Sequence, residues 1–366
     1  MIEIFANEES PKALGFAMPP EWSVQESVFL SWPSNPQTWP GVFRRAEEAY
    51  ASFAAAISRY ERVRIICAAS EFDRVNDALA DANACFERIE LLDIPTNDAW
   101  CRDHGPIFVK NPQTGERAVL DFTYNAWGGK FPPWDKDDAV PRHVAEYFNL
   151  RRFQIPFVCE GGALEVNGAG DLLTTRSVIL NENRNPGITE SEAEEILCES
   201  LGVEQVLWLD RGLSGDDTDG HIDTIARFVR EDAVLAPSAP SGSPNHDVLK
   251  ENIHALRRMR TSNSGTLLEV IPLNSPKPIT PEGWREEILP ATYANFLLIN
   301  HAVLVPTYRQ DSADTEAMEI IGQAYPGRTV IPIDCHDIIL EGGALHCRSE
   351  ERRVGKECRS RWSPYH

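Results

Sequence analysis

A cysteine, a histidine and several carboxylates, widely separated along the chain, are the residues whose chemistry could be combined in one site. Cys347 offers a thiol, His221 an imidazole, and Asp223 a carboxylate two residues further on. A thiolate attacks electrophilic carbon, an imidazole moves protons near neutral pH, and a carboxylate binds cations. These residue types therefore predict nucleophilic chemistry on a positively charged substrate, provided that the fold brings them together.

His221 and Asp223 belong to the segment DGHIDTIARFV, residues 219–229. Its β-branched residues predict an extended stretch over 222–229, and side chains two apart in a strand project from the same face. An imidazole and a carboxylate placed in this way can act together. The same pattern is also typical of a polar strand end, so the segment alone does not establish a site.

The segment WCRDHGP, residues 100–106, concentrates charge between an aromatic residue and a Gly-Pro turn. Such a segment suits either a surface loop or the rim of a pocket. Asp103 could bind a ligand, pair with Arg102 or cap a turn.

The five residues EGGAL occur twice, at 160–164 and at 341–345. This recurrence indicates repeated supersecondary modules. Glu160 and Glu341 each precede two glycines, which permit close approach of the backbone or an unusual φ. Each carboxylate could bind a substrate or simply accept hydrogen bonds from backbone amides.

Cys347 directly follows His346 at the end of the second repeat. If residues 345–347 are extended, His346 and Cys347 point to opposite faces, so His346 is not expected to be the base for this thiol. His221 is the better candidate. The eight cysteines of the chain show no C-x-x-C pair, and most are expected to be reduced core residues.

Apolar spacing predicts helices that alternate with short runs of Val, Ile and Leu. The expected helices are 42–60, 72–84, 189–201, 247–259 and 314–324, and the third starts with Thr189 and Glu192 in capping-box spacing. The expected strands are 63–67, 119–122, 172–175, 206–209, 222–229, 296–299 and 303–306. The alternation predicts an α/β protein, and it continues without a flexible linker, so we expect a single domain.

Composition narrows the function classes further. The 366 residues carry a net charge of −21 and contain no basic stripe interleaved with aromatic residues, which argues against nucleic-acid binding and favours a small cationic ligand. The N-terminus lacks the pattern of a signal peptide and no stretch is apolar enough for a membrane span, so a cytoplasmic enzyme is expected.

The end of the chain differs from the rest. Residues 348–366, RSEERRVGKECRSRWSPYH, are basic, lose the apolar periodicity and resemble a translated sequencing adapter. We therefore expect a catalytic domain over 1–347, truncated at its C-terminal end, and a non-native tail over 348–366.

Read together, these segments resemble the agmatine deiminase family, the branch of the guanidine-modifying (pentein) superfamily related to bacterial peptidylarginine deiminases. The resemblance runs from about Met18 to Cys347. It rests on MPPEW, FLSWP, YNAWGGKFPPWDKDDAVP, LNENRNPG and DGHID, in this order. It implies a fivefold pseudosymmetric α/β propeller with the site at the central axis, which would account for the repeated EGGAL.

The resemblance also implies a role for each site residue. Cys347 would be the nucleophile, His221 the general acid and base, and Glu160 the residue that orients His221. Asp103 and Asp223 would bind the substrate guanidinium, and Trp100 would line the pocket. No metal or organic cofactor is expected, and related enzymes are usually homo-oligomers.

The expected reaction is hydrolysis of agmatine to N-carbamoylputrescine and ammonia through a covalent thiouronium on Cys347, as in polyamine biosynthesis. Where relatives that act on agmatine commonly have Asn before Ile-His-Cys, this chain has Ala344 before Leu-His-Cys. Other guanidino substrates, including peptidylarginine, therefore stay open, as do a catalytically lapsed protein that binds polyamines or guanidinium compounds, a Cys-His amidase and an amidinotransferase.

Overall fold

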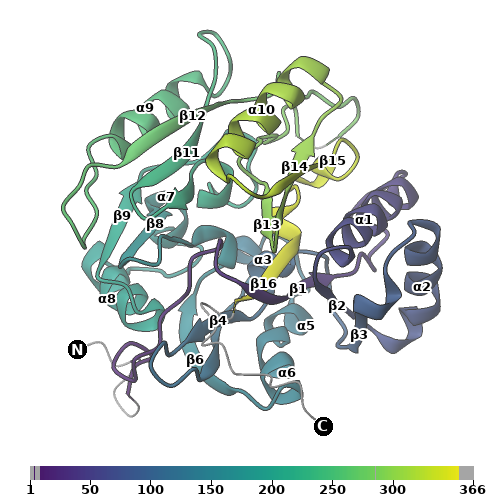
Figure 1. The fold of residues 1–366 in the computed structure, drawn as a ribbon, viewed down its shortest axis with the longest axis horizontal. Helices are drawn as coiled ribbons and strands as arrows, with labels where there is room; N and C mark the ends of the chain where they lie inside the picture. The colour runs from purple at the N-terminus through teal and green to yellow at the C-terminus, as the bar shows by residue number, and fades with distance from the viewer. Residues whose placement is uncertain (1–3, 5–8, 285, 354–366) are drawn as a thin grey trace, which may run out of the picture.

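The chain forms a mixed α/β structure, described here from a computed structural model in which residues 4, 9–284 and 286–353 are placed. The described strands form five separate small sheets. Short strands and the turns that precede them lie towards the middle of Figure 1, whereas the longer helices lie at its periphery. The predicted α/β class is confirmed.

Four of the sheets share one topology. In each, the first strand runs antiparallel to the second, and the second runs parallel to the third. A helix lies in every connection between second and third strands, as a parallel crossover requires. The strands are β4 (Ile107–Lys110), β5 (Arg117–Thr123), β6 (Arg151–Val158), β7 (Glu165–Val166), β8 (Asp171–Thr175), β9 (Gln205–Leu209), β10 (Arg227–Arg230), β11 (Ala233–Ser238), β12 (Glu269–Asn274), β13 (Leu297–Ile299), β14 (Ala302–Thr307) and β15 (Thr329–Asp334).

The remaining sheet joins the two ends of the chain. It consists of β1 (Gln25–Ser31), β2 (Arg62–Cys67) and β3 (Ile89–Asp93), and β16 (Ser349–Arg353) pairs antiparallel with β1. β16 therefore occupies the place of a first strand and lies within the segment expected to be a non-native tail. The remainder of that segment, 354–366, lies outside the described residues, and its origin stays a prediction.

The five long helices expected from periodicity are confirmed, with small shifts at their ends. They are α1 (Phe43–Ser58), α2 (Phe72–Asp81), α8 (Glu190–Leu201), α9 (His246–Leu256) and α10 (Asp311–Ala324). The capping box of α8 is formed, because Thr189 Oγ1 accepts from the Glu192 amide and the Glu192 carboxylate accepts from the Thr189 amide. The shorter helices are α3 (Cys101–His104), α4 (Ala126–Gly129), α5 (Asp135–Asp138), α6 (Val140–Tyr147) and α7 (Arg176–Ile179).

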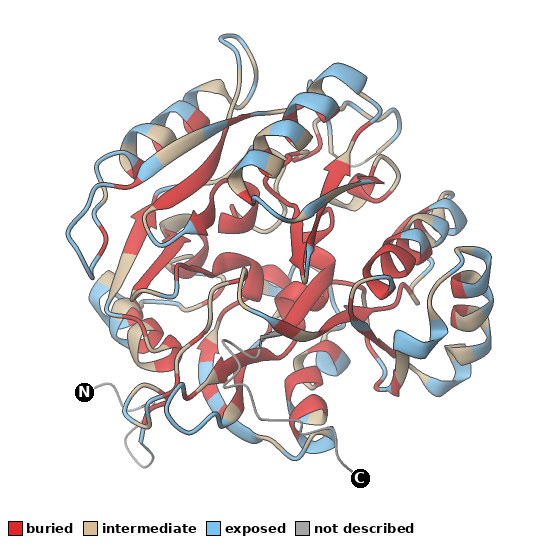
Figure 2. Ribbon diagram, in the orientation of Figure 1, coloured by how far each residue is buried: buried red, intermediate tan, exposed pale blue. Residues whose placement is uncertain are grey.

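The core lies between the sheets and the helices that cover them. Figure 2 shows buried strands in the middle of the molecule and helices whose outer faces are exposed. Within the described part of the chain, no helix is both long and apolar enough to cross a membrane.

Short helical turns stand directly before the first strands, and they position the site. They are α3 before β4, η4 (Gly161–Ala163) before β7, η5 (Ile222–Thr224) before β10, and η7 (His346–Arg348) before β16. α3 contacts η4 and η7, and η4 contacts η5, so these turns from distant parts of the chain meet.

Two local expectations are wrong here. The extended stretch predicted over 222–229 begins with η5, and the strand starts only at Arg227. Residues 345–347 are not extended either, because Leu345 has αR dihedrals and η7 follows. In both places, tertiary contacts outweigh the β propensity of the residues.

Candidate active site

A cavity of about 720 Å³ opens where these turns meet. Its wall includes four of the predicted site residues, Trp100, Asp103, His221 and Cys347, together with Trp127. Glu160 and Asp223 are completely buried and lie behind the wall. The structure therefore brings all six predicted site residues together, although they come from four different turns or their flanks.

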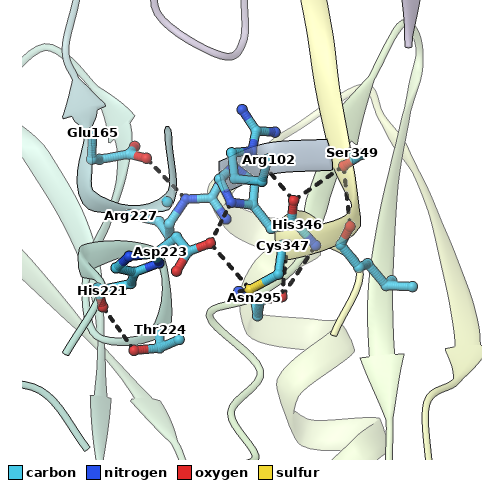
Figure 3. A network of polar contacts seen from close by, with 12 residues as sticks. Arg102, Glu165, His221, Asp223, Thr224, Arg227, Asn295, His346, Cys347 and Ser349 are labelled. Atoms are coloured by element: carbon cyan, nitrogen blue, oxygen red, sulfur yellow. Dashed lines mark hydrogen bonds and ion pairs between the residues drawn. The ribbon is translucent and has the colours of Figure 1, made fainter. Parts of the chain in front are cut away.

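Cys347 lies in η7 and is only 3% exposed. Its Sγ accepts a hydrogen bond from Asn295 Nδ2 at 3.1 Å and donates to Asp223 Oδ2 at 3.5 Å (Figure 3). Burial raises the pKa of the thiol well above its usual value, and the negative charges of Asp223 and Asp103 raise it further. At neutral pH Cys347 is therefore a protonated thiol.

His221 stands between two carboxylates. Its Nδ1 lies 3.5 Å from Asp103 Oδ1 and its Nε2 lies 3.7 Å from Glu160 Oε2, which are longer than good hydrogen bonds. Burial alone would lower the pKa of this imidazole, but Asp103 and Glu160 raise it to about 9. His221 is therefore a cation at neutral pH and can donate a proton.

Asp103 is fixed by two donors, the Trp127 indole at 3.1 Å and the Gly162 amide at 3.1 Å. Burial and the nearby carboxylates raise its pKa to about 6, although His221 acts in the opposite direction. Arg102, the alternative partner, instead pairs with Glu350 and Glu351. Asp103 thus lines the cavity and is paired with His221 instead of its sequence neighbour Arg102.

Asp223 uses only one of its oxygens within the protein. Oδ2 lies 2.7 Å from His346 Nδ1, whereas the buried Oδ1 has no hydrogen-bond partner among the described residues. Burial would raise the pKa of this carboxyl, but His346 holds it below its usual value. Asp223 is therefore an ionised carboxylate with a free acceptor atom beside Cys347.

Glu160 is held by Arg184, whose Nε donates to Oε1 at 2.8 Å. Arg184 also pairs with Asp219, which pairs with Lys130 at the cavity wall. Burial would raise the pKa of Glu160, but His221 and Arg184 lower it. Glu160 is thus a negatively charged neighbour of His221.

Aromatic rings form the remaining wall near the thiol. Trp100 packs edge-on against Trp127 with their ring centroids 5.7 Å apart, and the Arg348 guanidinium lies 4.1 Å from the Trp100 centroid. Flat apolar walls of this kind suit an alkyl chain or a planar cation.

The repeated EGGAL segments both reach the site, but with different conformations. The first continues into η4, whereas in the second Glu341 ends η6 (Ile339–Glu341) and Gly342 is left-handed. A Cβ at Gly162 would lie 2.5 Å from His221 Nδ1, and one at Gly343 would lie 2.5 Å from Trp100 and 2.9 Å from the Cys347 Cβ. The third position of each repeat therefore needs glycine for close packing.

Residues that the sequence interpretation missed hold the predicted ones in place. Asn295 Oδ1 accepts from the amides of Ala344 and His346, so it fixes the turn that carries Cys347. Asn295 lies shortly before β13, the first strand of its sheet, and the other site residues lie at equivalent positions before the first strands of their sheets. This position was the signal that could have identified Asn295. The other missed residues are Glu21, Trp127, Arg184 and His346.

The fold and this site define a mixed α/β protein with a buried cysteine, a histidine between carboxylates, and a shared cavity. The family model for the Porphyromonas-type peptidyl-arginine deiminases matches residues 17–352. The chain belongs to this family.

Relatives agree over almost the whole length. An agmatine deiminase from Ectopseudomonas mendocina is 34% identical over 94% of this chain and 97% of its own. The structure of an Enterococcus faecalis agmatine deiminase matches 95% of this chain and 98% of that one, with a TM-score of 0.89 and 31% identity. A cysteine-to-serine variant of a C. jejuni agmatine deiminase with substrate bound matches 93% and 97%, with a TM-score of 0.83 and 31% identity.

Proposed function

We propose that this protein hydrolyses agmatine to N-carbamoylputrescine and ammonia. The observation that carries the substrate assignment is the charge of the cavity wall, which among the described residues includes six acidic side chains, two lysines and the His221 imidazolium but no arginine. The acidic residues are Asp98, Asp103, Asp137, Asp216, Asp217 and Glu341. Such a wall favours a substrate with positive charge at both ends and offers no bidentate partner for an α-carboxylate.

Asp216 is the best candidate for binding the amino end of agmatine. Its Oδ1 accepts hydrogen bonds from Thr218, but its buried Oδ2 has no partner among the described residues. Burial raises the pKa of this carboxyl. An ammonium group would supply the missing donors and favour the ionised acid.

At the other end, the guanidinium would be held by Asp103 and Asp223 and would face Cys347. A guanidinium stays protonated and presents a planar fork of donors that two carboxylates can accept. Its positive charge would offset the carboxylates that raise the pKa of the thiol. Substrate binding would therefore help to form the thiolate.

In the proposed mechanism, the Cys347 thiolate adds to the guanidinium carbon, and the His221 imidazolium protonates the departing amine, which leaves as ammonia. The product of this step is a thiouronium linked to Cys347. His221, now neutral, takes a proton from water, the resulting hydroxide adds to the same carbon, and Cys347 leaves as thiolate. The O-protonated product then loses its proton to the departing ammonia or to solvent and becomes the neutral ureido group. Glu160 would keep His221 oriented through both steps.

We also propose that the five sheets, each with the helices that connect its strands, form five modules arranged with fivefold pseudosymmetry around the site. The shared strand order and the placement of a site residue before each first strand support this arrangement. One site residue stands two to five residues before each first strand. In chain order these residues are Asp103, Glu160, Asp223, Asn295 and Cys347.

The decisive experiment offers the protein agmatine, arginine and a peptidyl-arginine separately and measures ammonia and the ureido product. We expect ammonia and N-carbamoylputrescine from agmatine. Citrulline from arginine without ammonia from agmatine would overturn the substrate assignment. Dependence of turnover on an added amine acceptor would instead indicate amidino transfer.

Asp216→Asn tests the proposed amino-end contact. Because a charge-assisted hydrogen bond contributes about 1.5–3 kcal/mol, KM for agmatine should rise about 10- to 100-fold. Butylguanidine, which lacks the amino group, is the matched control and should be affected little. An equal effect on both compounds would contradict the assignment.

A further inference from the structure

The imidazole of His346 lies between two buried carboxylates. Its Nδ1 is 2.7 Å from Asp223 Oδ2 and its Nε2 is 3.1 Å from Glu21 Oε2. Each ring nitrogen thus faces an acceptor, and only the imidazolium form has a proton on both. His346 is itself 1% exposed, so water cannot substitute for either contact.

The two carboxylates are held in the ionised form. Glu21 pairs with Arg227 and accepts from the Leu298 amide, so it has no proton to donate to His346. Burial would raise the pKa of Glu21, but Arg227 and His346 hold it well below its usual value.

Other charges also face this ring. Arg102 Nε donates to the His346 carbonyl at 3.3 Å, and Arg227 packs nearby with its partner Glu165. A Glu351 oxygen lies within 4.8 Å of the facing atoms of Glu21 and His346. Burial and the two arginines lower the pKa of His346, but Glu21 and Asp223 outweigh them and the net direction is upward.

The contact with His346 fixes the orientation of Asp223, which lies behind the cavity wall. Oδ2 is shared between His346 Nδ1 and Cys347 Sγ, and Oδ1 is buried with no partner among the described residues (Figure 3). A carboxylate fixed at one oxygen can offer the other to a ligand in a single orientation.

We propose that His346 is a positioning residue: its imidazolium anchors Asp223 Oδ2 beside Cys347 and leaves Oδ1 free to accept the substrate guanidinium. This inference rests on the proposed function for the identity of the ligand. His346 does not act as a base, because both of its nitrogens already donate. The sequence prediction also argued against His346 as the base, but it assumed that residues 345–347 form a strand in which His346 and Cys347 point to opposite faces. The structure has a helical turn there instead.

Three substitutions separate the two contacts of the ring. His346→Asn keeps a neutral donor near the place of Nδ1, His346→Gln keeps one near the place of Nε2, and His346→Ala removes both. We expect KM for agmatine to rise about 10- to 100-fold in the Gln and Ala variants, and by less than about 10-fold in the Asn variant. His254→Asn is the control, since His254 is exposed on α9 and distant in sequence from the site residues.

The pH profile provides a readout that a merely structural role would not change. Removing a cation beside Asp223 raises the pKa of that carboxyl, so binding should fail at a higher pH as the solution is acidified. The acid limb of kcat/KM should therefore move upward in all three variants, and least in the Asn variant, which keeps a neutral donor near Asp223. The same shift should appear in agmatine binding measured in a Cys347→Ser background, where no turnover occurs.

Nitrogen-15 spectra of labelled histidine test the inference even without activity. We expect the ring-nitrogen signals of His346 to show an imidazolium at pH 7.5. These signals are assigned by their disappearance in any His346 variant that folds. If none folds, they are assigned by the shift that Cys347→Ser causes. A neutral His346 at this pH overturns the proposal, as do Gln and Ala variants that lose thermal stability but keep KM and the acid limb. If the wild type does not turn over agmatine, the proposed function fails, and the spectra still decide the state of His346.

Discussion

At the scale of single residues, the site combines a protonated thiol, a protonated imidazole and several buried carboxylates. Cys347 is protonated because burial, Asp223 and Asp103 raise the pKa of its thiol, and His221 is protonated because Asp103 and Glu160 raise its pKa to about 9. The thiol must therefore lose its proton before it can attack, whereas His221 already carries the proton that the departing amine requires. A substrate cation between the two aspartates would favour the thiolate.

This charge distribution predicts the pH dependence of alkylation at Cys347. Since the raised pKa keeps the thiol protonated at neutral pH, neutral iodoacetamide should react slowly at pH 7 and about tenfold faster per pH unit above it. The cationic reagent 2-chloroacetamidine should react much faster at the same pH, because it brings its own positive charge. Mass spectrometry measures both rates, and Cys347→Ser gives the background from the other cysteines. A rate for iodoacetamide that does not change between pH 6 and 9 would show that the thiolate is already formed.

At the scale of elements, the short turns before the first strands carry the chemistry, and the long helices do not. η7 can bring Cys347 beside Trp100 only because Gly343 has no side chain, since a Cβ there would lie 2.5 Å from the Trp100 ring. Asn295 then fixes the turn through its amide oxygen. Position within the turn, more than intrinsic propensity, sets the direction of the thiol.

Gly343→Ala tests the role of this close approach. The added methyl must displace Trp100 or Cys347, and small misplacements of reacting groups can cost about 100-fold in rate, so kcat should fall by roughly that factor. Gly187→Ala is the control, because nothing lies within 4 Å of a Cβ at that position, although its backbone is left-handed and that of Gly343 is not. Steady-state kinetics with thermal melts distinguishes the two. A Gly343→Ala variant with normal kcat would contradict the close-packing argument.

At the scale of the whole molecule, the two ends of the chain close one sheet and thereby position the nucleophile. β16 pairs with β1, and Glu350 and Glu351 of β16 pair with the buried Arg102 of α3, next to Asp103. The last described strand is thus joined to the first strand by backbone pairing and to the turn with Asp103 by buried ion pairs. Loss of Glu351 would leave Arg102 with the Glu350 carboxylate and remove one buried hydrogen bond between charged groups.

Glu351→Gln should therefore destabilise the protein substantially. Loss of a buried hydrogen bond between charged groups typically costs about 1.5–3 kcal/mol, which should lower the melting temperature by several degrees. Glu269→Gln removes an exposed pair with Arg230 and should change stability by less than about 1 kcal/mol. Scanning calorimetry compares the two variants, and equal melting temperatures would argue against a structural role for this closure.

Much of this architecture could be predicted from sequence, because local patterns carry it. Amphipathic spacing located the five long helices, and Thr189 with Glu192 marked the start of α8. Ordered motifs located the six candidate site residues, whose roles stay predictions. Residue types alone also indicated a cationic substrate.

Other features depend on contacts between residues far apart in sequence. The extended conformations expected around Asp223 and Cys347 became helical turns because Asn295 and His346 bind them from elsewhere. Arg184 and Glu21 could not be recognised, since nothing in their own segments shows that Glu160 and His346 lie beside them. Periodicity and motifs are local properties and were determined by the sequence itself, whereas charge balance and side-chain orientation at the site depend on distances that only the folded chain establishes.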